Sequence, residues 1–162
     1  MKLQELISQT ELDMTVAHIK AFFLGIMSAE KPMPFKKAME EMLSQTPEAT
    51  PLLEAELQKL WDEVAKNKPA EYQNFFPAAV DTNKFLEQAK DQLDFFLTAL
   101  SLSGTNPETC KNEDLADLID ELEDTVMDLD EYLADPAEKA EGEELQEMLL
   151  ETWQEFVRLA KR

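Results

Sequence analysis

Apolar residues recur at the three- and four-residue spacing of an α-helix along nearly the whole chain, and this pattern limits the possible folds more than any other feature. In the clearest segment, residues 112–135, one helical face carries Leu115, Leu118, Ile119, Leu122, Val126, Leu129 and Leu133. Glycine occurs only 3 times in 162 residues, which argues against a turn-rich all-β fold and against glycine-rich phosphate-binding loops. We therefore predict an all-α fold, a single-domain bundle of six to seven helices.

The chain length fits one domain, which we assign to residues 1–162. Helices are expected over residues 2–9, from an N-cap at Thr10 to before Pro32, from Pro34 past Leu43, over 51–66, over 82–102, from an N-cap at Asn112 to before Pro136, and over about 138–160. Pro69 is expected to close the helix over 51–66, and Gly104 to stop the helix over 82–102. Residues 67–81 contain Pro69 and Pro77 and form the expected irregular connection between two halves of similar size.

The charge of the chain is strongly negative and unevenly distributed. Asp and Glu number 35 against 15 Lys and Arg, which gives a formal charge of −20, and residues 82–162 carry −15 of it. Such a field repels nucleic acid and anionic lipid, so neither direct nucleic-acid binding nor membrane association is expected. The longest apolar stretch, residues 21–27, is also far too short to span a bilayer.

Cys110 is the only cysteine and His18 the only histidine. A single cysteine excludes an internal disulfide and a cysteine-based zinc cage, and a single histidine excludes every metal centre that needs several. We interpret His18 as a packed or boundary residue and Cys110 as an inert, exposed thiol. We expect no cofactor and no metal site and, because the first residues lack a signal-peptide pattern, a cytoplasmic location.

The segment between Glu113 and Asp135 contains eleven carboxylates and no Lys or Arg. Its outer face includes Asp117, Glu121, Asp124, Asp128 and Glu131, which we call the acidic stripe. Their spacings of four and three residues make them neighbours on one helical face, where like charges repel by a few tenths of a kcal/mol per pair. The apolar face behind the stripe must outweigh that repulsion.

Four interpretations of the acidic stripe are open. The first is a solvated surface that keeps the protein in solution, and the second is a docking site for a basic protein surface. The third is a divalent-metal site, and the fourth is a mimic of nucleic acid. Pairs such as Glu121 with Asp124, or Glu144 with Glu147, have the spacing found in all-α, Mg²⁺-dependent nucleotide pyrophosphohydrolases. From these alternatives we predict a non-enzymatic acidic interaction or regulatory protein, and keep the pyrophosphohydrolase and the nucleic-acid mimic as alternatives.

Two segments of the chain echo each other: residues 22–28 read FFLGIMS and residues 95–101 read FFLTALS. Either both converge on one tight packing motif or a helical hairpin has been duplicated. Small residues facing large ones allow two helices to approach closely, so we expect both segments to serve packing.

Residues 96–104, FLTALSLSG, resemble the second F-L-x-G-L-G-L-x-G segment of the YecA/YgfB-like family of bacterial proteins. Residues 21–26, 113–120 and 155–158 resemble three further family motifs in the same order, so the likeness spans about residues 15–160. Ala99 and Ser101 stand where the family has glycines, and Lys20 and Leu24 stand where it has His and Cys. The resemblance implies an all-helical cytoplasmic bacterial protein without established enzymatic activity that self-associates, for example as a homodimer.

Overall fold

Eight α-helices make up the regular structure of the computed structural model, which describes residues 3–9, 14–43, 51–76, 81–136 and 139–160. The helices are α1 (Leu3–Ser8), α2 (Val16–Ser28), α3 (Phe35–Leu43), α4 (Pro51–Lys66), α5 (Lys68–Gln73), α6 (Thr82–Leu102), α7 (Glu113–Ala134) and α8 (Lys139–Ala160). The described ranges contain no strand. The predicted all-α fold is therefore confirmed.

The predicted number of helices, six to seven, is too low because α5 lies inside the stretch 67–81 that was expected to be irregular. Pro69, the expected end of the preceding helix, instead occupies the first turn of α5. Proline is tolerated there because the first turn of a helix contains N–H groups that have no partner within the helix. The described irregular part of this connection is reduced to residue 67, residues 74–76 and residue 81.

Helix α2 begins later than expected. Thr10, the predicted N-cap, lies outside the described residues, and the N-cap of α2 is Thr15. The Thr15 hydroxyl accepts a hydrogen bond from the backbone N–H of His18, and His18 Nδ1 accepts one from the backbone N–H of Thr15, both at 3.2 Å. This reciprocal pair is a capping box with histidine at the third helical position, where Glu or Gln is usual.

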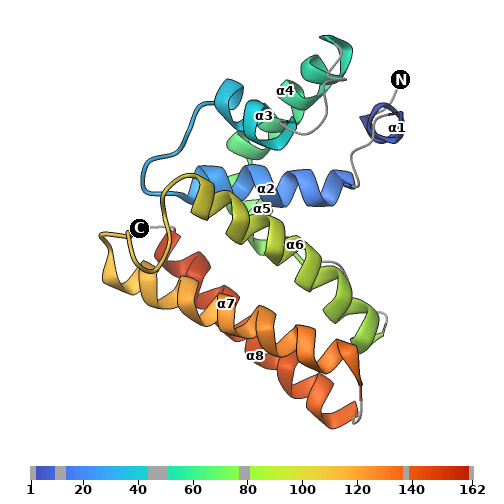
Figure 1. Ribbon diagram of the computed structural model, residues 1–162, viewed down its shortest axis with the longest axis vertical. Coiled ribbons are helices and arrows are strands. Elements are labelled where there is room, and N and C mark those ends of the chain that lie inside the picture. The colour runs from blue at the N-terminus through green and yellow to red at the C-terminus, as the bar shows by residue number, and fades with distance from the viewer. Residues whose placement is uncertain (1–2, 10–13, 44–50, 77–80, 137–138, 161–162) are drawn as a thin grey trace.

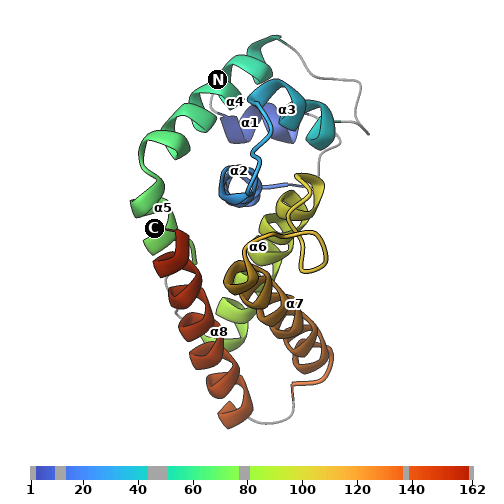
Figure 2. The same ribbon diagram turned by 90° about the vertical axis from the view of Figure 1, so that its left-hand side faces the viewer.

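The helices form an elongated arrangement with two ends and a centre (Figure 1). Helices α1, α3 and α4 lie around α2 at one end, and the antiparallel pair α7 and α8 forms the other. Helix α6 connects the two ends, because it packs against α2 and against both α7 and α8 (Figure 2). The contact between α2 and α6 is the most extensive between any two helices of the described chain.

The two echo segments meet at this contact. Gly25 of α2 lies against the α6 backbone, so that a Cβ atom added at Gly25 would come within 2.4 Å of Phe96 O and 2.8 Å of the Ala99 Cβ. Phe23 and Phe96 are both fully buried beside the crossing. The expected packing role of both segments agrees with this arrangement, in which small residues allow the helices to touch.

Aromatic side chains fill the space between α5, α6 and α8. The Trp153 ring stacks on Phe75 with ring centroids 4.3 Å apart and on Phe156 at 5.4 Å, and Phe96 meets its edge. Its Nε1 donates to the backbone oxygen of Tyr72 at 2.9 Å. Trp153 is therefore a core residue, whereas Trp61 is only half-buried and packs edge-on against Phe23.

The loop between α6 and α7 is tied to the end of α2 by Glu30. Gly104 ends α6 with a positive φ of 80°, as its expected C-terminal position requires. Beyond it, the two carboxylate oxygens of Glu30 accept hydrogen bonds from the backbone N–H groups of Lys111 at 2.8 Å and Asn112 at 3.1 Å. The bond from Lys111 is the main reason that the pKa of the Glu30 carboxyl lies below its ordinary value.

We expect Glu30→Gln to lower the melting temperature at pH 7, because the charged acceptor at the start of α7 is lost. A carboxyl whose pKa is lowered by folding stabilises the protein above its unfolded-state pKa, and this contribution disappears as pH falls through the folded-state value. The difference in melting temperature between wild type and variant should therefore shrink below about pH 4.3, the ordinary glutamate value. Thermal unfolding followed by circular dichroism over a pH series measures this difference, and Glu40→Gln, at an exposed glutamate, is the control. A melting-temperature difference that stays constant or widens in acid would contradict the prediction.

Candidate functional site

The acidic stripe lies on the solvent side of α7. The cap at Asn112 is confirmed, since its side-chain oxygen accepts a hydrogen bond from Leu115 N at 3.2 Å. From there the apolar face turns toward α6 and α8, and Ile119, Leu122 and Leu129 are buried. All five stripe residues, Asp117, Glu121, Asp124, Asp128 and Glu131, are exposed on the opposite side. The helix is thus fixed by its apolar face and presents its carboxylates to solvent.

Very little of the α7 charge is compensated. The Lys90 ammonium group of α6 lies 3.0 Å from the Asp130 carboxylate and 3.1 Å from that of Asp94. The hydrogen bond to Asp130, followed by the contact with Asp94, raises the pKa of the Lys90 ammonium group. Within the described residues, Asp130 is the only α7 carboxylate in an ion pair, and it lies outside the stripe. In the same part of the chain, no stripe carboxylate forms an ion pair.

Glu123 of α7 is affected by burial first and by neighbouring like charges second. Partial burial, followed by the nearby charges of Asp120, Asp124 and Glu108, raises the pKa of the Glu123 carboxyl. A raised carboxyl pKa means that the folded state disfavours the charged form, so this group opposes folding at neutral pH. The apolar face of α7 must offset this cost, as the sequence pattern predicts.

Helix α8 extends the acidic surface on one side. Asp128 and Glu131 line a hollow of about 550 Å³ whose far wall is formed by Glu141 and Glu144 of α8. Asp117 lines a second hollow of about 400 Å³ with Glu155 and Arg158, at the other end of the helix pair. Glu121 and Asp124 line neither of these hollows. The structure therefore places the five stripe residues along one face, with three of them at the seam between α7 and α8.

The carboxylates of this surface are spread along the helices. In the described parts of the chain, no group of three or more His, Cys, Asp or Glu side chains is placed to share a metal ion. The pyrophosphohydrolase alternative needs carboxylates from two helices to converge on Mg²⁺, and those residues do not supply such a centre. Among the same residues, no helix is both long enough and apolar enough to cross a lipid bilayer.

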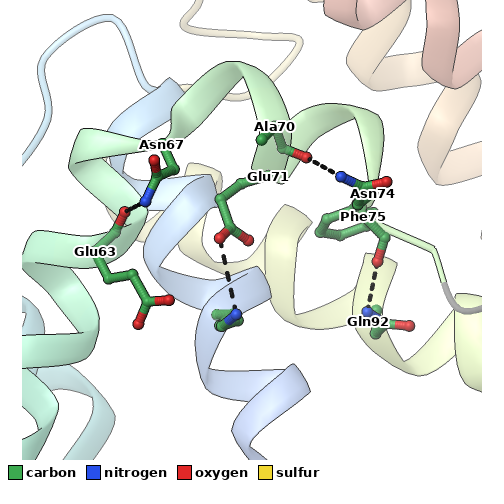
Figure 3. Close-up of polar contacts among 8 residues, drawn as sticks. Glu63, Asn67, Ala70, Glu71, Asn74, Phe75 and Gln92 are labelled. Carbon is green, nitrogen blue, oxygen red and sulfur yellow. Dashed lines mark hydrogen bonds and ion pairs between the residues drawn. The ribbon is translucent and has the colours of Figure 1, made fainter.

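A third hollow, which the sequence did not indicate, lies where α2, α5 and α6 meet. It is a groove of about 520 Å³ with an apolar floor and a rim that includes His18, Lys20, Glu71, Asp91 and Gln92. Figure 3 shows the Glu71 carboxylate directed from α5 toward α2, where Lys20 Nζ lies 3.8 Å away. It also shows Gln92, whose amide donates to Phe75 O at 2.8 Å and joins α6 to the end of α5. These residues come from separate helices, so no sequence motif brings them together.

The reactive side chains of this groove and of the α6–α7 loop are engaged in structural contacts. The Thr15 hydroxyl and His18 Nδ1 are used by the helix cap, and the His18 ring stacks on Phe95 with centroids 4.7 Å apart. Cys110 is half-buried, and desolvation raises the pKa of its thiol, which disfavours the nucleophilic thiolate. The prediction of a packed histidine agrees with this geometry. An inert thiol fits the Cys110 environment, but the predicted exposure of that thiol is wrong because the α6–α7 loop half-buries it.

Comparisons of the chain with protein-family models, with curated proteins and with solved structures found no match. The resemblance to YecA/YgfB-like proteins therefore stays a prediction.

Proposed function

We propose that this chain is a non-enzymatic interaction protein that binds a basic protein surface through the acidic stripe of α7. One observation carries the proposal: all five stripe carboxylates are exposed on a single face and have no ion-pair partner among the described residues. The buried opposite face holds α7 in place, so the stripe is a fixed array of charges.

Such an array attracts a basic partner over a distance. The field of clustered charges raises the association rate of a complementary surface, and salt screens this effect because the Debye length at physiological ionic strength is only about 8 Å. The carboxylates of α8 add to the same field, since α8 contains six Glu and only two basic residues. The expected complex is therefore salt-sensitive, and its association rate responds to charge more than its dissociation rate.

The alternatives differ in what they require. A pyrophosphohydrolase needs a converged carboxylate centre, and the spread of the α7 and α8 side chains gives that alternative no support. A nucleic-acid mimic needs the same exposed stripe but a partner whose basic surface binds DNA or RNA. We propose a cytoplasmic location, which suits a chain with a single, half-buried cysteine.

Neutralisation of the stripe tests the proposal. Asp117→Asn, Glu121→Gln, Asp124→Asn, Asp128→Asn and Glu131→Gln combined should abolish low-salt capture of a positively charged protein from a bacterial lysate. For a captured partner, stopped-flow or surface-binding kinetics should show an association rate lowered by about tenfold or more and a dissociation rate changed much less. The melting temperature should stay equal or rise slightly, because like-charge repulsion along α7 is relieved.

A control with the same change in net charge separates the stripe from the overall charge of the chain. It replaces five exposed glutamates on other helices by glutamine: Glu5, Glu40, Glu54, Glu63 and Glu87. This control should keep most of the association rate. If it weakens binding as much as the stripe variant does, only net charge matters, and if neither variant weakens binding, the stripe is a solubilising surface.

A further inference from the structure

An apolar groove separate from the acidic stripe lies where α5, α8 and the start of α6 meet. Its volume is about 480 Å³, and its apolar lining comes from Tyr72, Phe76, Phe85, Leu150, Trp153 and Val157. None of the five stripe residues lines it. The groove therefore offers a second binding surface on the same molecule.

The floor of the groove is held rigidly. Trp153 is fixed by its hydrogen bond to Tyr72 O at 2.9 Å and by stacking on Phe75 and Phe156. The Tyr72 hydroxyl in turn lies 2.6 Å from the Ser28 hydroxyl of α2. A binding surface that is already ordered loses little conformational entropy when a ligand arrives, so more of the contact energy appears as affinity.

Leu150 is the exposed apolar side chain at the edge of this floor. It is 37% exposed although the neighbouring Trp153 and Val157 are buried. Three amides, Gln73, Gln146 and Gln154, form the rim together with Arg158. An aliphatic side chain beside an aromatic floor, surrounded by hydrogen-bonding groups, has the layout of the centre and rim of a protein interface.

A row of carboxylates follows the outer flank of the groove along α8. Glu143, Glu147 and Glu151 are spaced four residues apart, so they form one line on the helix surface. Glu143, Glu147 and Glu151 lie three residues before the groove residues Gln146, Leu150 and Gln154, respectively. Each glutamate is therefore next to its groove residue on the helix surface. All three are exposed and have no ion-pair partner among the described residues, whereas the rim cation Arg158 is paired with Glu155 at 2.9 Å.

We propose that this groove binds a cationic amphipathic helix of a partner protein. The apolar residues of that helix, spaced three and four apart, lie on Trp153 and Leu150, and its Lys or Arg residues face Glu143, Glu147 and Glu151. The negative charge of the carboxylate row favours a cationic occupant. A second copy of this chain, whose formal net charge is −20, would bring like charge to the same row. The proposal is argued from other residues than the proposed function, because none of the five stripe residues lines the groove or belongs to the carboxylate row of α8.

A synthetic peptide tests the groove directly. The probe is a fluorescein-labelled peptide of about 18 residues, made of Leu and Lys in amphipathic helical order, and binding is followed by anisotropy at physiological salt. A peptide of the same composition in scrambled order is the charge control. We expect the helical probe to bind at least about tenfold more tightly than the scrambled one, since the apolar floor discriminates between them.

Protein variants then locate the probe. Leu150→Gln should weaken binding at least about fivefold, and Glu143→Gln, Glu147→Gln and Glu151→Gln combined should weaken it and reduce its salt dependence. Leu52→Gln, at a 52% exposed leucine on α4, is the matched control and should leave binding unchanged. Neutralisation of the five stripe residues should lower affinity by less than the groove variants do.

Three results would overturn the proposal. Equal affinity for the helical and scrambled peptides would show attraction by net charge alone. Binding that survives Leu150→Gln but is lost on stripe neutralisation would place the probe on α7, which would leave the proposed function standing while this inference fails. Sedimentation that shows a wild-type dimer and a Leu150→Gln monomer would identify a second copy as the occupant of the groove.

Discussion

Leu122→Asp is expected to destabilise the protein by more than about 4 kcal/mol, the range reached when a charge is buried without a partner. Leu122 lies in the middle of α7 and has no exposed surface, so the new carboxylate would be enclosed by the core. Because small domains are stable by only about 5–15 kcal/mol, the variant should be largely unfolded or melt far below wild type. Urea unfolding followed by circular dichroism measures the difference.

Met127→Asp on the same helix is the matched control. Met127 is 68% exposed, so the same carboxylate remains in water and adds only local repulsion, with an expected loss within about 1 kcal/mol. If Leu122→Asp unfolds in urea at nearly the wild-type midpoint, the face of α7 assigned to the core is not buried. Leu122→Ala, expected to lose about 2–5 kcal/mol, supplies a graded measurement should the aspartate variant fail to fold.

Gly25→Leu is expected to have the second largest effect, a loss of more than about 3 kcal/mol. Even the first atom of any side chain at Gly25 would lie 2.4 Å from the Phe96 carbonyl oxygen, and a backbone atom cannot move aside as a flexible side chain can. Helices α2 and α6 would have to separate at their most extensive contact. The midpoint of thermal or urea unfolding measures the loss.

Gly25→Ala separates packing from helix propensity. In an exposed helix this change would stabilise by about 1 kcal/mol, so any net loss at Gly25 reports the collision with α6. Ala65→Leu, an exposed position on α4, is the size control and should change stability by no more than about 0.5 kcal/mol. Wild-type stability in Gly25→Leu would mean that the two helices do not approach as closely as the structure shows.

The sequence alone predicted the properties that depend on local periodicity. The spacing of apolar residues in α6, α7 and α8 indicated helices whose bounds agree closely with the structure. Asn112 was expected to cap α7 and Gly104 to stop α6, and both residues do so. The same periodicity placed Leu122 inside and the acidic stripe outside, because residues three and four apart must share a helix face. Exposure of the stripe was therefore predictable, although its partner was not.

Local rules failed where a distant contact was decisive. Pro69 looked like the end of a helix, yet it sits in the first turn of α5, whose Tyr72 is held by Trp153 from 81 residues further along the chain. The start of α2 depends on His18, which caps the helix and stacks on Phe95 of α6. The sequence contains these residues but gives no sign that they meet.

What the sequence by itself determined is which residues are helical, which face of each helix is apolar, and where the negative charge lies, since these follow from interactions within a few residues. The tertiary structure decided which helices touch. Gly25 is required because the α6 backbone passes over it, Glu30 caps α7 because the fold brings the end of α2 to that loop, and the groove beside Trp153 exists because three helices converge there. Such contacts depend on how apolar faces of separate helices pack together, and that choice is made by the core as a whole.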